Sequence, residues 1–193
     1  MEAALAQIAM PQGSGNLLFL CLGKAGAERA LGEGHIRYAG VEPDPFRMAC
    51  YYQASDVYIH AALGEAFGKT VTEAMACGTP VVTTAVDGIP EQVEDGVTGF
   101  LVPPSQAQRL GPAAQQLLTD SALHGRMSRA GVARVVQRFS LDRQVREFLG
   151  WYEEVLEDWS QWKSREAPTR GSPPVRKMAR WSRQAVIARN RQS

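Results

Sequence analysis

Short apolar runs alternate with amphipathic stretches along the first hundred residues. The apolar runs are only a few residues long and nearly continuous, which is typical of strands that a parallel sheet buries on both faces. Between them, apolar positions recur every three or four residues, as they do on one face of a helix. The pattern predicts strands at 17–22, 35–39, 56–60, 80–84 and 99–102, and helices at 45–54 and 70–77 with a short helical turn at 89–95.

From about residue 106 the pattern becomes purely helical. Apolar residues between Leu110 and Leu118 follow the spacing of one buried helix face, and further helices are expected over about 121–137 and 142–159. Alternation of strands and helices predicts an α/β fold, with a parallel sheet, right-handed crossovers and helices on both faces, followed by C-terminal helices. Ligands of such sheets bind at the carboxyl ends of the strands.

Composition narrows the class of protein. With 193 residues, 45% apolar and 21% charged, the chain is expected to form one globular domain. No apolar run approaches the roughly 18 residues of a membrane-spanning helix, and the start carries Glu2 and no basic region, unlike a secretory signal. Cys21, Cys50 and Cys77 are far apart, which favours buried free thiols over a disulfide framework or a zinc site. This cysteine pattern is typical of the cytoplasm.

Charge divides the chain into two parts. Residues 1–162 contain 12 basic and 19 acidic side chains, a net charge of −7, whereas residues 163–193 contain nine basic and one acidic, a net charge of +8. The acidic body gives no sign of nucleic-acid binding. Pro, Gly and Ser near 160–174 indicate a boundary, so we expect a domain at 1–160 and a linker with a basic tail at 161–193. The tail either forms a basic amphipathic helix that contacts an anionic membrane or an acidic partner, or remains a disordered, soluble extension.

The segment 60–104 contains the candidate chemistry. A predicted strand leads into a loop with Gly64 and Gly68, and a helix is expected to begin at about Thr70. Free backbone N–H groups and the positive end of the helix dipole then point at one place, where an anion can bind. Lys69 adds a positive charge beside it. A phosphate or diphosphate is the natural ligand of such a site.

Two carboxylates flank this anion site. Glu65 lies in the loop and Glu73 in the first turn of the helix. A carboxylate accepts two hydrogen bonds from neighbouring hydroxyls, so the arrangement suggests a nucleotide-sugar. Three alternatives need no ligand: Thr70 and Glu73 can form a capping box, Glu65 can be a solvated loop acid, and Lys69 can be a surface lysine.

The order of these residues resembles that of family 4 glycosyltransferases. The likeness covers roughly residues 15–158 and is strongest where Glu65-Ala66-Phe67-Gly68 is followed by Glu73-Ala74-Met75-Ala76-Cys77-Gly78-Thr79-Pro80-Val81-Val82. It continues through Gly88-Ile89-Pro90-Glu91 and Asp95-Gly96. Members of this family have two Rossmann-like domains facing each other across a cleft, so the resemblance implies that this chain is the Rossmann-like donor-binding domain.

The resemblance also implies roles for individual residues. Glu65, as the catalytic residue, would contact the hydroxyls of the donor sugar, and Glu73 would bind the ribose. The backbone of Phe67, Gly68, Lys69 and Thr70 would line the diphosphate. Gly88 and Glu91 would close the same pocket, and the segment 37–41 would flank the nucleobase. Transfer would retain the anomeric configuration and need neither cofactor nor catalytic metal, in agreement with the lack of a D-x-D motif.

Some expected parts of the family pattern are missing. Set against the family pattern, this sequence is expected to lack the acceptor domain and the first donor-domain strand, which in the family carries the Gly-Arg and Lys that hold the diphosphate. We therefore expect a partner, or a missing half, that supplies the acceptor site, and we expect an exposed sheet edge to make the chain associate. Asp87-Gly88 stands where Gly-Gly is commoner, and segment 24–34 is short. Two other functions stay open: a non-catalytic nucleotide-sugar-binding subunit, and an interaction protein acting through its basic tail.

Overall fold

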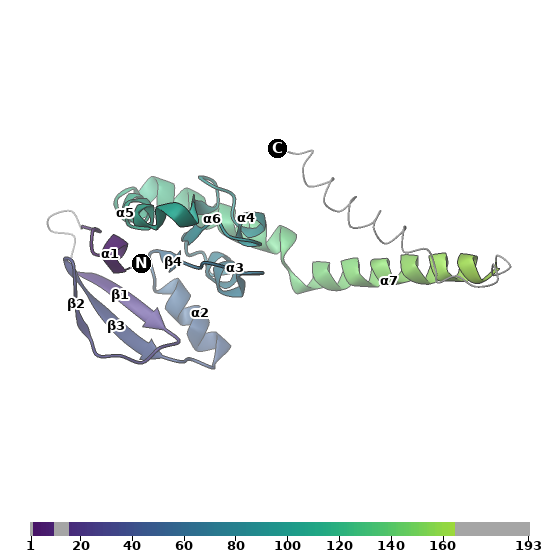
Figure 1. The fold of residues 1–193 in the computed structure, drawn as a ribbon, viewed down its shortest axis with the longest axis horizontal. Helices are drawn as coiled ribbons and strands as arrows, with labels where there is room; N and C mark the ends of the chain where they lie inside the picture. Colours follow the sequence, from purple (N-terminus) through teal and green to yellow (C-terminus); the bar gives the residue numbers. More distant parts are fainter. Residues whose placement is uncertain (1, 10–15, 165–193) are drawn as a thin grey trace. The chain divides into compact units, whose positions relative to one another are not determined.

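The computed structural model describes residues 2–9 and 16–164, and they form an α/β fold (Figure 1). The chain folds into two compact units, the first at residues 1–143 and the second from residue 144 onward. The strands lie in the first unit, in one three-stranded sheet of order β1-β3-β2 and another of order β4-β5-β6. The predicted α/β class, with parallel strands and helices on both faces, is confirmed.

The first sheet combines parallel and antiparallel pairing. β1 (Leu17–Leu22) runs parallel to β3 (Gly34–Gly40), and β2 (Arg29–Leu31) pairs with β3 in the antiparallel sense. β2 is absent from the sequence-based prediction, which left residues 24–34 without a strand. Gly32 makes the tight turn between β2 and β3 with a φ of +57°, and a Cβ there would lie 2.3 Å from the Ala6 carbonyl oxygen. Only glycine fits this turn.

The second sheet is fully parallel. β5 (Val81–Thr84) lies between β4 (Tyr58–His60) and β6 (Gly99–Val102), and all four of its residues are buried. Successive side chains of a strand point to opposite faces. Val81 packs in the apolar cluster that contains residues of α3 (Lys69–Ala76) and α4 (Ile89–Gln92), whereas Val82 packs in the other cluster. The strand predicted at 56–60 begins two residues later, at Tyr58.

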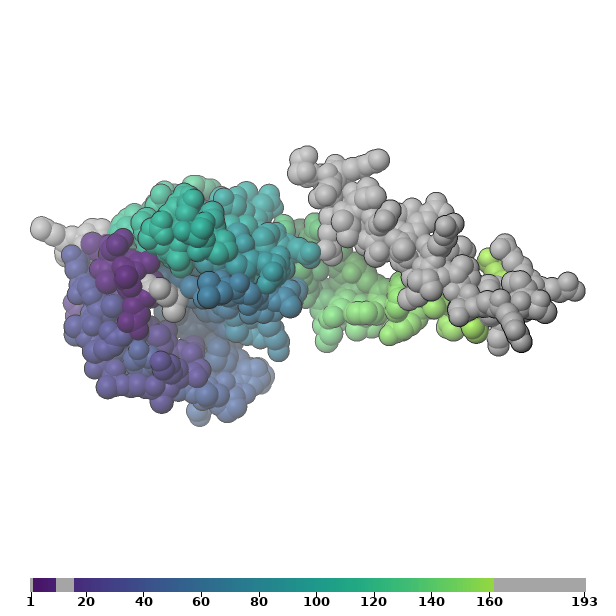
Figure 2. Space-filling model, viewed as in Figure 1, coloured from purple at the N-terminus to yellow at the C-terminus, as the bar shows by residue number. Residues whose placement is uncertain are grey.

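The remaining helices of the first unit cover these sheets. The cluster around Val82 includes Leu5 and Ile8 near the N-terminus together with Ile36 of β3, so one apolar core joins both sheets. Figure 2 shows the purple helix α1 against the teal helix α5, as their contacts require. The bounds are Glu2–Leu5 for α1, Pro45–Gln53 for α2, Pro104–Arg109 for the 3-10 helix η1, Leu110–Thr119 for α5 and Ser121–Arg138 for α6.

The helix predicted from about residue 106 begins later as an α-helix. Residues 104–109 form η1 instead, and Gln106 departs from helical geometry with φ −124° and ψ 36°. Pro112 explains the delay, because it would lie in the interior of a helix that began at residue 106 but is tolerated in the first turn of α5, where its missing N–H has no partner in the helix. From Leu110 onward the predicted buried face forms, with Leu110, Ala114 and Leu117 in the core.

The helix α7 (Leu141–Ser164) begins three residues before the second unit and contains all of that unit's described residues, 144–164. Its large apolar side chains recur every three or four residues and are exposed: Leu141, Val145, Phe148, Tyr152, Val155 and Trp159. None of the helices in residues 2–9 and 16–164 combines the length and apolar character that crossing a bilayer requires. The predicted boundary near residue 160 stays a prediction, and most of the basic tail lies outside the described residues.

Candidate functional site

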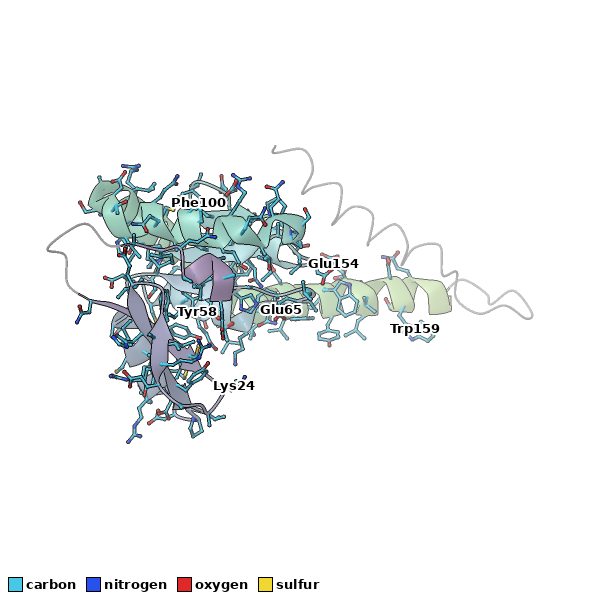
Figure 3. The ribbon with its side chains drawn as sticks, turned by 60° about the vertical axis from the view of Figure 1, so that its left-hand side comes forward. Lys24, Tyr58, Glu65, Phe100, Glu154 and Trp159 are labelled. Carbon is cyan, nitrogen blue, oxygen red and sulfur yellow. The ribbon has the colours of Figure 1, made fainter. Side chains whose placement is uncertain are left out.

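Tyr58 of β4 connects Glu65 to the start of α3. Its hydroxyl donates a hydrogen bond to Thr70 Oγ1 at 2.9 Å and lies 3.3 Å from His60 Nδ1. His60 Nε2 is in turn 3.7 Å from Glu65 Oε2. This nitrogen is buried and has no hydrogen-bond partner among the described residues. Figure 3 labels Tyr58 and Glu65 in this part of the first unit.

Tyr52 connects Tyr58 to the second carboxylate, Glu73. The Tyr52 hydroxyl donates to Glu73 Oε2 at 3.2 Å, and the Tyr52 and Tyr58 rings meet edge to face with centroids 5.5 Å apart. The Lys69 ammonium lies 3.7 Å from Glu73 Oε1. The two predicted carboxylates therefore lie at opposite ends of one chain of polar and aromatic contacts centred on Tyr58.

Both carboxylates act electrostatically on this tyrosine. Burial raises the pKa of Tyr58, and the negative charges of Glu73 and Glu65 raise it further, although the bond to Thr70 opposes them. Burial likewise raises the pKa of Tyr52, with Tyr58 and Glu73 adding to the effect. Both phenols therefore keep their protons near neutral pH and remain hydrogen-bond donors.

Backbone contacts hold the Glu65 loop against the end of β5. The Glu65 N–H donates to Asp87 Oδ2 at 2.9 Å, and the Gly88 N–H donates to the Glu65 carbonyl at 3.2 Å. Asp87 adopts a φ of +40°, and a Cβ on Gly88 would lie only 2.1 Å from the Ala66 carbonyl oxygen. The unusual Asp87-Gly88 pair thus has a structural reason, since one residue binds the loop through its carboxylate and the other leaves it room.

The start of α3 rules out the capping-box alternative. The helix begins at Lys69 with Gly68 as its N-cap and no side-chain cap, so Thr70 lies inside the helix. The Thr70 hydroxyl instead accepts from Tyr58, and the Glu73 carboxylate accepts from Tyr52. The predicted interaction of these two side chains with the backbone of the first turn is therefore wrong.

The backbone donors at this helix start are fewer than the sequence suggests. The Lys69 N–H donates to the Phe67 carbonyl at 2.8 Å, and the Gly68 N–H is 3.0 Å from the side-chain amide oxygen of Gln92 in the orientation that satisfies both groups. Among the described hydrogen bonds, the Thr70 N–H has no acceptor. Thr70 is consequently the backbone donor of this turn that an anion can use directly.

Phe67, Glu91 and Arg37, which also belong to the predicted site, have described contacts with residues outside the group around Tyr58. The Phe67 ring packs edge to face on Phe139, with centroids 5.9 Å apart. Glu91 lies exposed on α4, and its carbonyl accepts from Arg134. Arg37, in the segment predicted to flank a nucleobase, pairs with Glu28 at 3.0 Å on the first sheet. These contacts do not test the ligand-binding roles that the resemblance implies for the three residues, so those roles stay predictions.

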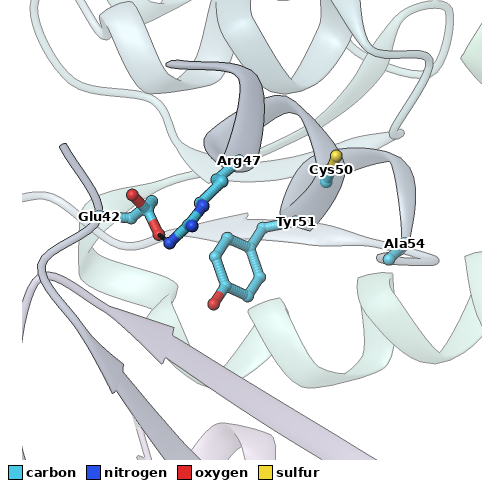
Figure 4. Close-up of a pocket in the computed structure, with 5 residues that line it drawn as sticks. All are labelled: Glu42, Arg47, Cys50, Tyr51 and Ala54. Atoms are coloured by element: carbon cyan, nitrogen blue, oxygen red, sulfur yellow. Dashed lines mark ion pairs between the residues drawn. The ribbon is translucent and has the colours of Figure 1, made fainter. Parts of the chain in front are cut away.

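A cavity of about 450 Å³ lies elsewhere, along α2 (Figure 4). An ion pair of 3.9 Å joins two of its lining residues, Glu42 and Arg47. The other lining residues are Cys50, Tyr51 and Ala54. None of the predicted donor-site residues borders it, so the cavity is separate from the centre around Tyr58.

Sequence reasoning missed several residues that build the centre. Tyr52 falls within the roughly 15–158 stretch that resembles the family, yet the resemblance implies no role for it. Neither Tyr58 nor Gln92 stands out in the local pattern, and Asp87 is notable only because glycine is commoner at its position in the family. Each contacts a segment that is distant along the chain, and only the tertiary fold brings the partners together.

Comparisons with known proteins show which proteins this chain is similar to. The family model described as "Glycosyl transferases group 1" matches residues 24–134. A D-inositol 3-phosphate glycosyltransferase of Mycobacterium leprae is 38% identical over 136 residues, which are 69% of this chain and 31% of that protein. An N-acetyl-alpha-D-glucosaminyl L-malate synthase of Bacillus anthracis is 36% identical over 104 residues, 54% of this chain and 27% of that protein. The chain thus spans less than a third of the length of these two relatives.

Solved structures show the same likeness. A sucrose-phosphate synthase of Thermosynechococcus elongatus superposes with a TM-score of 0.66 at 30% identity, over 81% of this chain and 41% of that one. Anabaena HepE, solved in complex with UDP-glucose, superposes with a TM-score of 0.54 at 30% identity, over 62% of this chain and 34% of that one.

Proposed function

This chain belongs to the glycosyl transferases group 1 family, and on that basis we propose that its Tyr58 centre binds a nucleoside-diphosphate sugar. Glu65 accepts hydrogen bonds from hydroxyls of the sugar to be transferred, and Glu73 accepts them from the ribose. The diphosphate lies between them, at the Thr70 N–H and the positive end of α3. Lys69 adds its charge, and Gly88 and Glu91 border the same site.

The observation that carries this proposal is the position of Tyr58. Its hydroxyl contacts Thr70 and His60, while Glu65 and Glu73 both raise its pKa. The N-terminus of α3 offers a backbone N–H donor, and a carboxylate lies on either side of it. This arrangement suits a ligand with an anionic middle and hydroxyl groups at both ends. The UDP-glucose bound to the related HepE has this composition.

We propose that the complete reaction is glycosyl transfer with retention, as in family 4 enzymes, without a catalytic metal. The positive end of α3 and Lys69 would stabilise the departing diphosphate in place of a metal ion. An acceptor-binding half, on a partner or on a longer polypeptide, would supply the second substrate and exclude water on closure. A non-catalytic nucleotide-sugar-binding subunit is the alternative.

Calorimetric titration tests the donor site on the full chain. UDP, GDP and ADP identify the nucleotide, and the matching nucleotide-glucose then probes the sugar. Glu73→Gln is expected to weaken both the nucleoside diphosphate and the nucleotide-sugar by about tenfold or more, because it removes charge-assisted hydrogen bonds to the ribose. Glu65→Gln should weaken only the nucleotide-sugar. Glu154→Gln on α7 is the matched control and should change neither.

Transferase activity separates the two alternatives. Release of nucleoside diphosphate that requires both an acceptor and an acceptor-binding half indicates an enzyme, and persistence of that release in EDTA supports a metal-free reaction. Binding without release under all of these conditions supports the non-catalytic subunit. Binding of none of the three nucleotides contradicts the donor-site proposal.

We further propose that the protein is cytoplasmic and contacts the inner membrane surface through its basic tail. Nine basic side chains and one acidic one in residues 163–193 support this, since about 1 kcal/mol is gained per basic residue near an anionic surface. Sedimentation with vesicles containing 30% phosphatidylserine should fall on removal of residues 163–193 and in high salt. Equal sedimentation of full and shortened chains contradicts it.

A further inference from the structure

We propose that Gln92 is a positioning residue for the anion-binding turn, a role that rests on the donor function proposed above. Gln92 is the last residue of α4, and its polar side chain is fully buried. Its side-chain amide reaches Gly68, the N-cap of α3, which is 24 residues away along the chain. A buried amide of this kind is costly unless it is fully hydrogen-bonded, which makes its partner specific.

The amide of Gln92 binds both backbone groups of Gly68. In the orientation that satisfies both groups, the Gln92 Nε2 donates to the Gly68 carbonyl at 3.1 Å and its Oε1 accepts from the Gly68 N–H at 3.0 Å. The same carbonyl accepts from the N–H groups of Val71 and Thr72, at 3.0 and 3.2 Å, which is how α3 begins. Gln92 therefore fixes the peptide groups from which the first turn of α3 is built.

Packing leaves Gly68 little freedom to move. A Cβ at this position would lie 2.5 Å from Ile89 Cδ1 and 3.1 Å from Val71 Cγ2. Ile89 and Val71 are themselves completely buried. Gly68 is thus held by two hydrogen bonds on one side and by close apolar contacts around it.

Arg134 of α6 holds the main chain of Gln92 from the other side. Its Nε donates to the Gln92 carbonyl at 2.6 Å, and a terminal nitrogen donates to the Glu91 carbonyl at 2.9 Å. The other terminal nitrogen lies 3.2 Å from Glu94 Oε2. Arg134 satisfies carbonyls at the end of the short helix α4, so Gln92 has a fixed base from which to reach Gly68.

The consequence concerns the next donor along the chain. Because Gly68 and Lys69 already donate within the protein, the Thr70 N–H is the group left for a phosphate oxygen. Its direction depends on the two peptide groups before it, and Gln92 holds both of them, one through the Gly68 N–H and the other through the Gly68 carbonyl. Loss of the Gln92 amide should therefore affect the diphosphate part of a ligand, with the nucleoside part unaffected.

Two measurements on the full chain test this, using Gln92→Met, which keeps the length of the side chain and removes its amide. The control is Gln53→Met, at an exposed glutamine of α2. Native-state amide exchange should be faster at Gly68 in Gln92→Met alone. In calorimetry, Gln92→Met should weaken UDP by about fivefold to tenfold, as loss of about one hydrogen bond does, and leave uridine unchanged.

The outcomes separate the possible failures. Unchanged exchange at Gly68 overturns the clamp itself, and faster exchange with unchanged UDP affinity overturns its positioning role. Equal loss of UDP and uridine also overturns that role, because it indicates general damage to the fold. Failure of the unmodified chain to bind UDP, GDP or ADP contradicts the donor function and the phosphate role together, while the exchange experiment still decides whether the clamp exists.

Discussion

Replacing Gly88 by alanine is the sharpest small perturbation of the Glu65 loop. The backbone of Gly88 has φ −81° and ψ −8°, which alanine adopts without strain. The added Cβ, however, would lie 2.1 Å from the Ala66 carbonyl oxygen. Any effect of Gly88→Ala therefore comes from lack of space beside the loop that carries Glu65.

The size of the effect follows from the geometry. Real Cβ contacts essentially never fall below 3.0 Å, so the Ala66 carbonyl or Gly88 must move by at least 0.9 Å. Overpacking of this kind costs about 1–3 kcal/mol. The movement also stretches the 3.2 Å hydrogen bond from the Gly88 N–H to the Glu65 carbonyl, which adds about 1 kcal/mol. We expect the free energy of unfolding to fall by about 2–4 kcal/mol.

Urea unfolding and calorimetry with UDP-glucose measure the two consequences. Gly88→Ala should be less stable and should bind the nucleotide-sugar more weakly, since Glu65 is displaced. The matched control is Gly64→Ala in the same loop, whose Cβ would meet Asp87 Oδ2 at an ordinary 3.4 Å and should change stability by less than about 0.5 kcal/mol. Equal behaviour of the two variants would refute the close contact.

Three further predictions concern the same centre and the sheet edges. Asp87→Ala should lower the free energy of unfolding by about 1 kcal/mol, because it removes the acceptor of the Glu65 N–H. Asp87→Asn keeps an acceptor and tolerates the positive φ, so it should be more stable than Asp87→Ala. Identical urea midpoints for these two variants would contradict this. Because the pKa values of Tyr52 and Tyr58 are raised in the folded protein, the unfolded chain loses these protons at lower pH, so stability should fall as the pH rises above about 10. Absorbance at 295 nm should show that two tyrosines of the folded protein ionise at higher pH than ordinary tyrosines. Ionisation of all tyrosines at the ordinary pH would contradict the prediction. Strands β1 and β4 each end a sheet, so light scattering should detect association of the isolated chain, and a strictly monomeric species would count against it.

The sequence predicted most elements because their signals are local. Val81 to Thr84 form a short run of β-branched residues beside Pro80, and they become a fully buried strand. The failure at β2 has a physical cause. Arg29 to Leu31 are too few and too polar to show a strand pattern, and they pair only because Gly32 turns the chain against β3.

The candidate site was only partly predictable. The motif indicates Glu65 and Glu73 as the carboxylates of the site, and contacts through His60, Tyr58 and Tyr52 connect the two. The contacts that hold them, from Asp87 to Glu65 and from Tyr52 to Glu73, span 22 and 21 residues. No local pattern reports such pairs, because they form only when β4, β5 and the two helices α2 and α3 come together.

A structure of the protein with UDP-glucose tests the donor-site proposal most directly. We predict the diphosphate within hydrogen-bond distance of the Thr70 N–H, the glucose hydroxyls at Glu65 and the ribose hydroxyls at Glu73. Density for the nucleotide-sugar in the cavity along α2, or anywhere that leaves both carboxylates without contact to it, would contradict the proposal.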